Sequence, residues 1–422
     1  MADTSDTSAS NAAQTAGTLP QGNSPLAEEL THTRNYYWFL VTYLVLLSAL
    51  GSFVNDMYSP ALPAMCRFFG CSVPLAQMGL TMGMIGLALG QLVLGPVSDR
   101  FGRKPVLIYS VVLFIVAAVV STFSPNIHVF NICRLFQGLG ASGGYFLART
   151  IPADVYSGRG LARLMALVGA INGIAPASAP VIGGVTADAF GWKGVFVVLA
   201  AFAGIILVLA WIMKESLSVS ARTRGSFLQS FTGYRLLLRN KPFIIHTCLK
   251  GIALGLLFAY ISASPFILQT HYGLSQTGYG LVIGFNALFM AVGSMLALKF
   301  KLLKNAAVAG AFIAAAGVCG QAIALYTVHS IWVFELFMLV ILFALGLIFT
   351  ASNTLAMNEG RHHAGEAAAL VGISGYIVGA IVSPLVGTGN ILHSTAIVFI
   401  VLSAVVVIFA IASRLLPPDL NK

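Results

Sequence analysis

The sequence predicts an all-α membrane protein in which twelve transmembrane helices form two pseudo-symmetric six-helix bundles. Composition is the first support for this: 58% of the 422 residues are hydrophobic and 9% are charged, with a mean hydropathy of +0.90. Soluble domains, in contrast, carry about 25% charged residues. The second observation is a series of apolar runs, each long enough to cross a bilayer. The third is a recurrence of small residues in every third run, which indicates an internal repeat.

Apolar runs and short polar breaks alternate from about Tyr36 onwards. A helix of about 20 apolar residues crosses the hydrocarbon core of a bilayer. The predicted spans are 36–58, 76–97, 105–123, 128–149, 162–187, 194–213, 242–266, 277–298, 306–327, 331–356, 366–388 and 394–416. Residues 1–33 are rich in Ser, Thr and Ala and contain no apolar run, so we expect them to form a disordered cytoplasmic tail.

The longest polar break, 214–241, divides the spans into two groups of six. The predicted organisation is an N-terminal six-helix bundle over 34–213, a cytoplasmic linker over 214–241, a C-terminal six-helix bundle over 242–416 and a C-terminal tail over 417–422.

Basic residues predict the orientation of the chain. Nineteen of the 23 Lys and Arg residues lie in the tails and loops on one side of the predicted membrane, whereas the other side holds only Arg67 and Lys193. Cytoplasmic loops are enriched in Lys and Arg, so we predict a multi-pass protein of the cell inner membrane with both termini cytoplasmic. The net charge of +10 is spread over these loops, which argues against a nucleic-acid partner.

Small residues three or four positions apart occur in the second, fifth, eighth and eleventh spans. They are Gly79, Gly83, Gly86 and Gly90; Gly169, Gly173, Pro180 and Gly184; Gly280, Gly284, Ala287 and Ala291; and Gly375, Gly379, Ser383 and Gly387. Such residues let neighbouring helix backbones approach closely. Glycine is also common in membrane helices in general, but the recurrence favours four three-helix units. Nested repeats of this kind are typical of secondary transporters with a central site between two halves.

The loop after the second span carries the most specific motif. Its functional residues are Gly95, Asp99, Arg100, Gly102 and Arg103. The two glycines permit a tight reversal at the membrane face, the arginines hold the loop in the cytoplasm, and the carboxylate can pair with an arginine or stabilise a helix N-terminus. An ordinary basic turn is the simpler interpretation of a single Gly-Arg-Lys triplet. The whole pattern over 95–105 resembles the signature loop of the major facilitator superfamily.

Further segments extend this resemblance over about residues 36–416. Arg134-Leu-Phe-Gln137-Gly138 in the fourth span resembles the Arg-x-x-Gln-Gly motif of the superfamily. The fifth span resembles the antiporter motif of twelve-span drug:proton exporters through Gly173, Pro180, Gly183 and Gly184, with Ala179 where that motif has Gly. The segment 55–63 is similar to the end of the first span in the Bcr/CflA drug-efflux subfamily, as are the shorter segments 264–266, 352–353 and 364–367. The loop 299–304 keeps the positive charge of the repeated signature but lacks its acidic residue.

The resemblance implies the major facilitator fold and proton-coupled efflux of small amphipathic compounds by alternating access. The expected partners are a small-molecule substrate, protons and the lipid bilayer, with the proton gradient in place of a cofactor and the chain acting as a monomer. A dedicated exporter or importer of one metabolite or siderophore is the alternative. A membrane enzyme or sensor is a remote alternative, because the sequence has no metal-ligand spacing, no nucleotide-binding loop and no clustered catalytic set.

Four ionisable residues fall within predicted spans: Asp56, Arg134, Lys250 and Glu335. Charges inside a membrane are functional candidates, because burying them is costly. Asp56 and Arg134 lie at similar depth, so we predict a proton-coupling role for them, with pairing either direct or through water. The other interpretations are that Asp56 caps the turn after the first span and that Arg134 joins helices.

The remaining two charges are predicted to lie far apart. Lys250 and Glu335 differ in depth by roughly 12 Å at 1.5 Å per helical residue, so a direct salt bridge is not expected. Lys250 can extend its ammonium to the cytoplasmic face, and Glu335 can be solvated at the outer interface. The predicted substrate-binding candidates are Tyr58, Asn172, Lys250, Phe258, Tyr260, Asn286 and Asn353. For the aromatic and amide residues, core packing and interhelical hydrogen bonds are the simpler alternatives.

Overall fold

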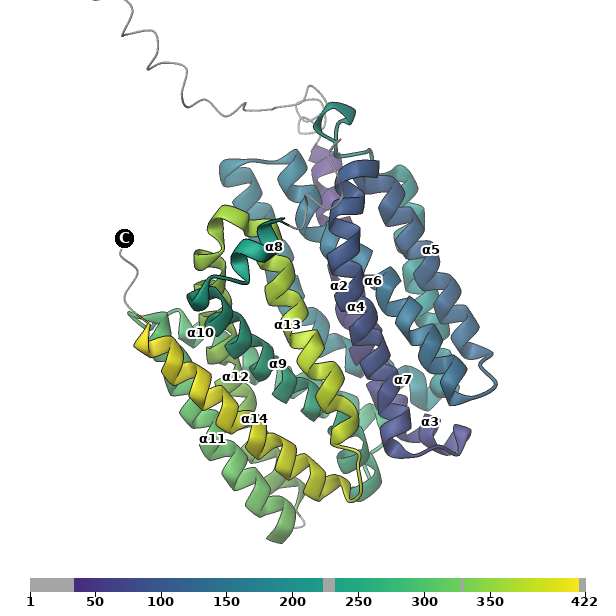
Figure 1. The fold of residues 1–422 in the computed structure, drawn as a ribbon. Coiled ribbons are helices and arrows are strands. Elements are labelled where there is room, and N and C mark those ends of the chain that lie inside the picture. The colour runs from purple at the N-terminus through teal and green to yellow at the C-terminus, as the bar shows by residue number, and fades with distance from the viewer. Residues whose placement is uncertain (1–33, 223–231, 328–329, 417–422) are drawn as a thin grey trace, which may run out of the picture.

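A computed structural model describes residues 34–222, 232–327 and 330–416, and within these residues it contains helices but no strands (Figure 1). The predicted tails, 1–33 and 417–422, lie outside the described residues. The long helices are α2 (Arg34–Asp56), α4 (Val73–Phe101), α5 (Arg103–Thr122), α6 (Ile127–Val155), α7 (Gly158–Ile212), α9 (Lys241–Pro265), α10 (Gln276–Ala297), α11 (Leu303–Thr327), α12 (Ile331–Glu359), α13 (Ala364–Leu385) and α14 (Ile391–Leu415). Shorter helices are η1 (Ser59–Ala61), α3 (Leu62–Phe69), η2 (Val219–Ala221), α8 (Thr232–Leu237), η4 (Phe266–His271) and η5 (Arg361–His363).

Ten described helical segments are long and apolar enough to cross a membrane. One of them, within α7, is interrupted at Gly191, whose φ of 68° lies in the left-handed region that glycine adopts readily. Helix α6 adds a further segment of 29 residues, which is also long enough to span a bilayer. Counting α7 as two spans, the described residues agree with the predicted twelve. A glycine break replaces the expected loop between the fifth and sixth spans.

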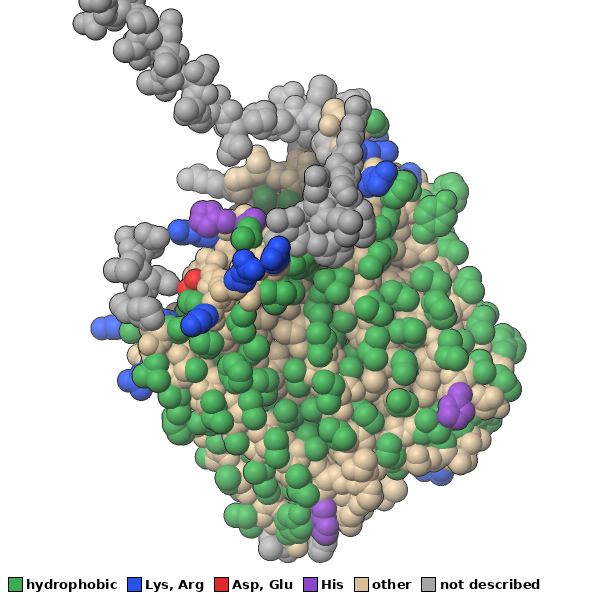
Figure 2. Space-filling view, viewed as in Figure 1, with side chains coloured by type: hydrophobic (Ala, Val, Ile, Leu, Met, Phe, Trp, Pro, Cys, Tyr) green, Lys and Arg blue, Asp and Glu red, His purple; other side chains and the backbone are tan. Residues whose placement is uncertain are grey.

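Two hydrophobic cores correspond to two halves of the molecule. One core is built mainly from buried side chains of α2 to α7, and the other from buried side chains of α9 to α14. Large apolar side chains such as Trp211 and Trp332 are exposed on the flanks, where lipid would surround them. Figure 2 shows hydrophobic side chains over the flank of the molecule, with most of the visible Lys and Arg near the end at which α2 begins and α14 ends. We call this end the termini face.

Glycines on α7, α10 and α13 lie at the contact between the two halves. A Cβ atom at Gly184 would overlap the backbone of Gln276 on α10, and one at Gly280 would overlap the carbonyl of Pro180 on α7. Gly387, just beyond the end of α13, similarly lies against Gln77 of α4. The glycines of α4 differ, because Gly86 packs against the backbone of α6 within the same half. The small residues thus permit the close helix approaches expected from the sequence.

The end opposite the termini face is closed by hydrogen bonds between the halves. The Ser59 and Tyr279 hydroxyls lie 3.3 Å apart, and the Gln269 amide donates to the Pro60 carbonyl at 2.8 Å. The Thr277 backbone N–H and hydroxyl both donate to the Asp188 carboxylate, at 2.8 and 2.6 Å. Most of these contacts involve η1 or the start of α10, so this closure depends on the segment that directly follows α2.

Candidate functional site

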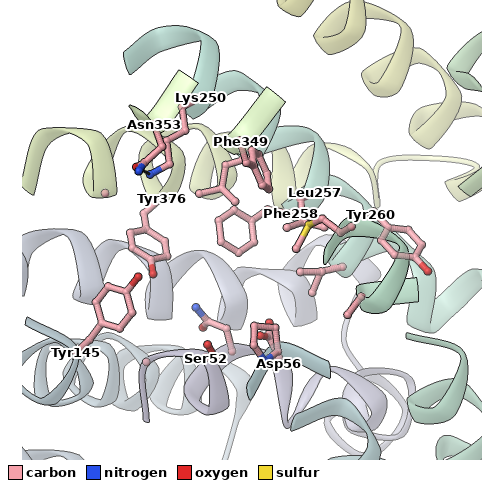
Figure 3. Close-up of a pocket in the computed structure, with 18 of the residues that line it drawn as sticks. Ser52, Asp56, Tyr145, Lys250, Leu257, Phe258, Tyr260, Phe349, Asn353 and Tyr376 are labelled. Atoms are coloured by element: carbon pink, nitrogen blue, oxygen red, sulfur yellow. Dashed lines mark hydrogen bonds between the residues drawn. The ribbon is translucent and has the colours of Figure 1, made fainter. Parts of the chain in front are cut away.

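A cavity of about 570 Å³ lies between the two halves, within the size range of small-molecule sites. Helices α2, α6 and α7 line it from one half, and α9, α10, α12 and α13 line it from the other. It extends toward the termini face, where Arg149 and Met357 near the ends of α6 and α12 contribute to its wall. Seven predicted site residues line this cavity, and all but Asn286 and Pro180 are labelled in Figure 3: Asp56, Pro180, Lys250, Phe258, Tyr260, Asn286 and Asn353.

Asp56 is the last residue of α2 and lines the cavity (Figure 3). Its backbone carbonyl accepts a hydrogen bond of 2.9 Å from the Ser59 hydroxyl. Among the described residues, its carboxylate has no hydrogen-bond or ion-pair partner. The turn after α2 is therefore closed by the backbone of Asp56 rather than by its side chain, and the carboxylate stays available to the cavity.

Arg134 is fully buried inside the N-terminal half and does not pair with Asp56. Its guanidinium donates to the Val54 carbonyl at 2.5 Å and to the Asn55 side-chain oxygen at 3.1 Å. Further bonds reach the Gly79 carbonyl at 3.4 Å and the Gln137 side chain. The expected direct Asp56–Arg134 pair is thus absent from the described contacts. Arg134 instead joins α2, α4 and α6 and holds the residue that precedes Asp56.

Tyr58 was a predicted substrate-binding residue, but it lies in the core of the N-terminal half. Its ring is fully buried, 4.2 Å from the Arg134 guanidinium carbon and beside Phe130 and Phe196. It does not line the cavity. Tyr58 therefore packs against the buried guanidinium of Arg134, where a cation–π contact helps to offset the cost of burying the charge.

Lys250 extends toward the cavity rather than toward the membrane surface. Its ammonium donates to the Asn353 side-chain oxygen at 2.7 Å, which joins α9 to α12 (Figure 3). Arg149 of α6 also lines the cavity, and its guanidinium bonds the Tyr145 hydroxyl and lies 4.2 Å from the Tyr145 ring. Arg149 is not among the site residues predicted from the sequence, because it lies at the end of a predicted span, where Lys and Arg are expected to act as orientation signals.

Glu335 lies against the cavity wall and not in solvent at the outer interface, which corrects the sequence-based expectation. The Asn286 amide donates to the Glu335 carboxylate at 2.8 Å and to the Tyr260 hydroxyl at 2.7 Å. The other carboxylate oxygen of Glu335 is buried and has no partner among the described residues. Glu335 and Lys250 have different partners, as their difference in depth predicted.

Aromatic side chains form much of the remaining wall. Phe258 and Tyr376 have ring centroids 5.8 Å apart, and Phe349 and Tyr145 also line the cavity (Figure 3). The predicted residues Asn172 and Gly173 belong to a stretch of α7 whose side chains are outside the described residues. The described wall of the cavity therefore combines an apolar lining with one carboxylate and two basic groups.

The signature loop forms a charge cluster on the termini face. Arg103 donates to Asp99 at 2.5 Å and to Asp154 at 2.8 Å. Gly102 has a φ of 102°, and a Cβ atom there would lie 2.6 Å from the Glu215 carboxylate, so both the backbone and the space require glycine. Glu215 accepts from the backbone N–H groups of Arg103 and Lys104, at 2.8 and 3.2 Å, and thereby caps α5.

One expectation for this loop needs revision. Gly95 was expected to permit a chain reversal, but it lies inside α4, where it packs against the Phe146 ring of α6. Arg100 is exposed and lies 5.8 Å from the Phe101 ring. The partners Asp154 and Glu215 were missed because they lie 51 and 112 residues from Arg103, and no local pattern connects them to it.

The described residues of the predicted antiporter motif lie where α7 contacts both the segment after α2 and helix α10 of the opposite half. Pro180 lines the cavity. A Cβ atom at Gly183 would overlap the Met57 carbonyl, directly after α2, and Gly184 faces α10 as described above. The motif residues therefore contact the segment that carries Asp56 as well as the opposite half.

Two pseudo-symmetric helical bundles with a cavity between them define the class of secondary transporters. Comparisons with known proteins identify the family within this class. Residues 44–384 match the Major Facilitator Superfamily. An uncharacterised transporter of the same type from Bacillus subtilis (strain 168), YdgK, is 34% identical over 82% of this chain and 88% of its own length. A bicyclomycin resistance protein homolog from Haemophilus influenzae is 26% identical over 91% of this chain and 97% of its own.

A solved structure has the same fold. The inward-facing, occupied form of a bacterial homolog of the human lysosomal transporter Spinster superposes with a TM-score of 0.73, at 15% identity, over 90% of this chain and 97% of its own. The family match over residues 44–384 and the relative that is 34% identical show that the chain belongs to the major facilitator superfamily. It is a multi-pass membrane transporter of small molecules and not an enzyme.

Proposed function

We propose that this protein exports small amphipathic compounds across the cell inner membrane in exchange for protons. In this proposal both termini are cytoplasmic, the cavity is open toward the cytoplasm, and the chain acts as a monomer with the proton gradient as its energy source. The observation that carries the proposal is the Asp56 carboxylate, which faces the cavity between the halves without a partner among the described residues. Lys and Arg are concentrated in the loops on one side of the membrane, which supports the proposed orientation. The names of the drug-resistance relatives support export.

The position of Asp56 suggests how proton binding would couple to movement of the halves. Asp56 ends α2, and Ser59, only three residues later, contributes to the closure of the far end. An ionised carboxylate needs water or a cation, whereas a protonated one can enter an apolar environment at lower cost. Loading a proton on Asp56 would therefore favour the state in which the cavity closes. A cationic substrate would compete with the proton for this carboxylate, whereas an anionic substrate would be coupled to the proton only through the movement of the halves.

Arg134 has a positioning role in this scheme. It fixes Val54 and Asn55, the two residues before Asp56, through hydrogen bonds from α6. A positive charge so close to the end of α2 would influence the protonation of Asp56 without forming a direct pair. The signature-loop cluster of Asp99 and Arg103 would act separately, by holding the termini face of the N-terminal half together during the movement.

Transport into proteoliposomes tests the proposal. Purified protein would be reconstituted with an imposed pH gradient, and accumulation would be measured for matched cationic, neutral and anionic amphipathic compounds. We expect at least one class to accumulate against its concentration gradient while protons move the other way, and a protonophore to abolish this accumulation. Transport that is equal with and without the pH gradient would contradict proton coupling. A single accepted compound would favour the dedicated transporter, the second candidate function, which the two basic groups in the cavity support.

A further inference from the structure

Two basic side chains approach the cavity from opposite halves without an acidic partner. Lys250 comes from α9, and Arg149 comes from α6. The hydrogen bonds of Lys250 and Arg149 go to Asn353 and Tyr145, both neutral groups. The ion pairs found among the described residues involve other bases, namely Arg103, Arg222 and His363. The cavity therefore contains two cations whose charges no described carboxylate neutralises.

This arrangement is electrostatically unfavourable in an empty cavity. Lys250 and Arg149 are half-buried side chains of like charge that line one cavity, so their charges repel each other, and the apolar wall around them strengthens this repulsion. Asp56 is the one described acid in the wall, and it lies at the far end of the cavity near the closed side. An anion between Lys250 and Arg149 would relieve the repulsion and would receive charge-assisted hydrogen bonds from both.

The surroundings of the two bases fit the rest of an amphipathic molecule. Phe258, Phe349 and Leu257 offer apolar surface to the cavity, and the side chains of Tyr145 and Tyr376 lie close to each other (Figure 3). The Tyr145 hydroxyl is also the hydrogen-bond partner of Arg149. We propose that Lys250 and Arg149, with Asn353 holding the lysine in place, form an anion subsite, and that the transported compounds carry a carboxylate, sulfonate or similar acidic group on an apolar body. The inference deepens the proposed function, since export of these compounds rests on it.

Binding measurements test the subsite independently of transport. The full chain would be placed in nanodiscs of phosphatidylcholine, and calorimetry would compare 2-naphthoate with its neutral amide, 2-naphthamide. The two probes share one apolar body and differ in charge. We expect naphthoate to bind wild-type protein about tenfold more tightly than naphthamide, the ratio that a single good interaction provides.

Substitutions assign the preference to the two bases. Lys250→Gln and Arg149→Gln should each remove most of the preference for naphthoate while naphthamide binding persists, which also shows that the variants are folded. Lys250→Arg should retain the preference, because it keeps the charge. Lys193→Gln is the matched control, since Lys193 lies outside the cavity over the Phe68 and Trp192 rings, and it should behave like wild type.

Two results would overturn the inference. Equal binding of naphthoate and naphthamide by wild-type protein would show that no anion subsite exists, as would a preference that survives the Lys250→Gln, Arg149→Gln double variant. Nanodiscs containing phosphatidylglycerol distinguish the source of the anion: if this lipid displaces naphthoate, the subsite binds a lipid phosphate and the assignment to substrate is wrong. Failure of proton-driven transport with the preference intact would instead contradict the proposed function alone.

Discussion

The buried guanidinium of Arg134 connects three helices of the N-terminal half. It satisfies carbonyl oxygens of Val54 and Gly79 and the side chains of Asn55 and Gln137, all inside the N-terminal half. The arginine that binds these acceptors is fully buried, so removing its side chain leaves them without this donor in the protein interior. The same side chain therefore fixes the end of α2 and stabilises the packing of three helices.

Replacing this arginine should be costly. Arg134→Gln leaves several buried acceptors without a donor, so we expect the free energy of unfolding to fall by about 3 kcal/mol or more. Thermal unfolding of purified protein would measure the change. Arg100→Gln is the matched control because Arg100 is exposed, and its effect should stay within about 0.5 kcal/mol. Equal melting of the two variants would show that Arg134 is not needed to hold α2, α4 and α6 together.

At the scale of helices, α7 depends on glycine where it crosses the end of α2. A methyl group at Gly183 would overlap the Met57 carbonyl, whereas one at Gly204 of the same helix would meet nothing within 4 Å. Gly183→Ala should therefore destabilise the protein and impair transport. Gly204→Ala should be neutral or slightly stabilising, by up to about 1 kcal/mol, because alanine favours helix. Melting temperatures and transport rates of the pair would show the difference, and indistinguishable variants would refute the close approach.

At the termini face, the two acidic partners of Arg103 differ in exposure and should differ in their contribution to stability. Asp154 and Asp99 both bind Arg103, but Asp154 is 14% exposed and also accepts from Ser216, whereas Asp99 is 45% exposed. We expect Asp154→Asn to lower the melting temperature more than Asp99→Asn, because more of its interaction energy is shielded from solvent. Asp99→Asn should slow transport while equilibrium substrate binding is kept, since the loop lies away from the cavity. Loss of binding in folded Asp99→Asn protein would argue against this division of roles.

For the whole molecule, the sequence predicts the fold well because the membrane restricts backbone structure to helices of known length. The distribution of Lys and Arg predicts the orientation of the chain, and the repeated glycines predict its internal repeat. The candidate site is predicted less completely. Depth arithmetic placed Asp56 near Arg134, but it could not show that the guanidinium turns toward Asn55. It also placed Glu335 at the interface, although Asn286 of another helix binds it. Such partners are distant in sequence and depend on helix rotation.

Orientation in the membrane is testable for the whole chain. In a variant whose native cysteines are replaced by serine, a single cysteine at Ser220 should be protected from an impermeant thiol reagent in intact cells. A single cysteine at Thr270, which is exposed at the closed end, should react. Replacing the native cysteines matters because Cys66 and Cys71 lie near the same end as Thr270. The reverse labelling pattern would invert the topology and, with it, the direction proposed for the cavity opening.

The most direct test of the central claim concerns Asp56. In proteoliposomes, Asp56→Asn should abolish accumulation driven by a pH gradient, because the amide can neither bind nor release a proton. Exchange of labelled for unlabelled substrate, which needs no proton release, should survive and would show that the variant is folded. Glu335→Gln is the matched control, since Glu335 is held by Asn286 and does not line the cavity, and it should keep gradient-driven accumulation. Undiminished proton-driven accumulation by Asp56→Asn would contradict the account.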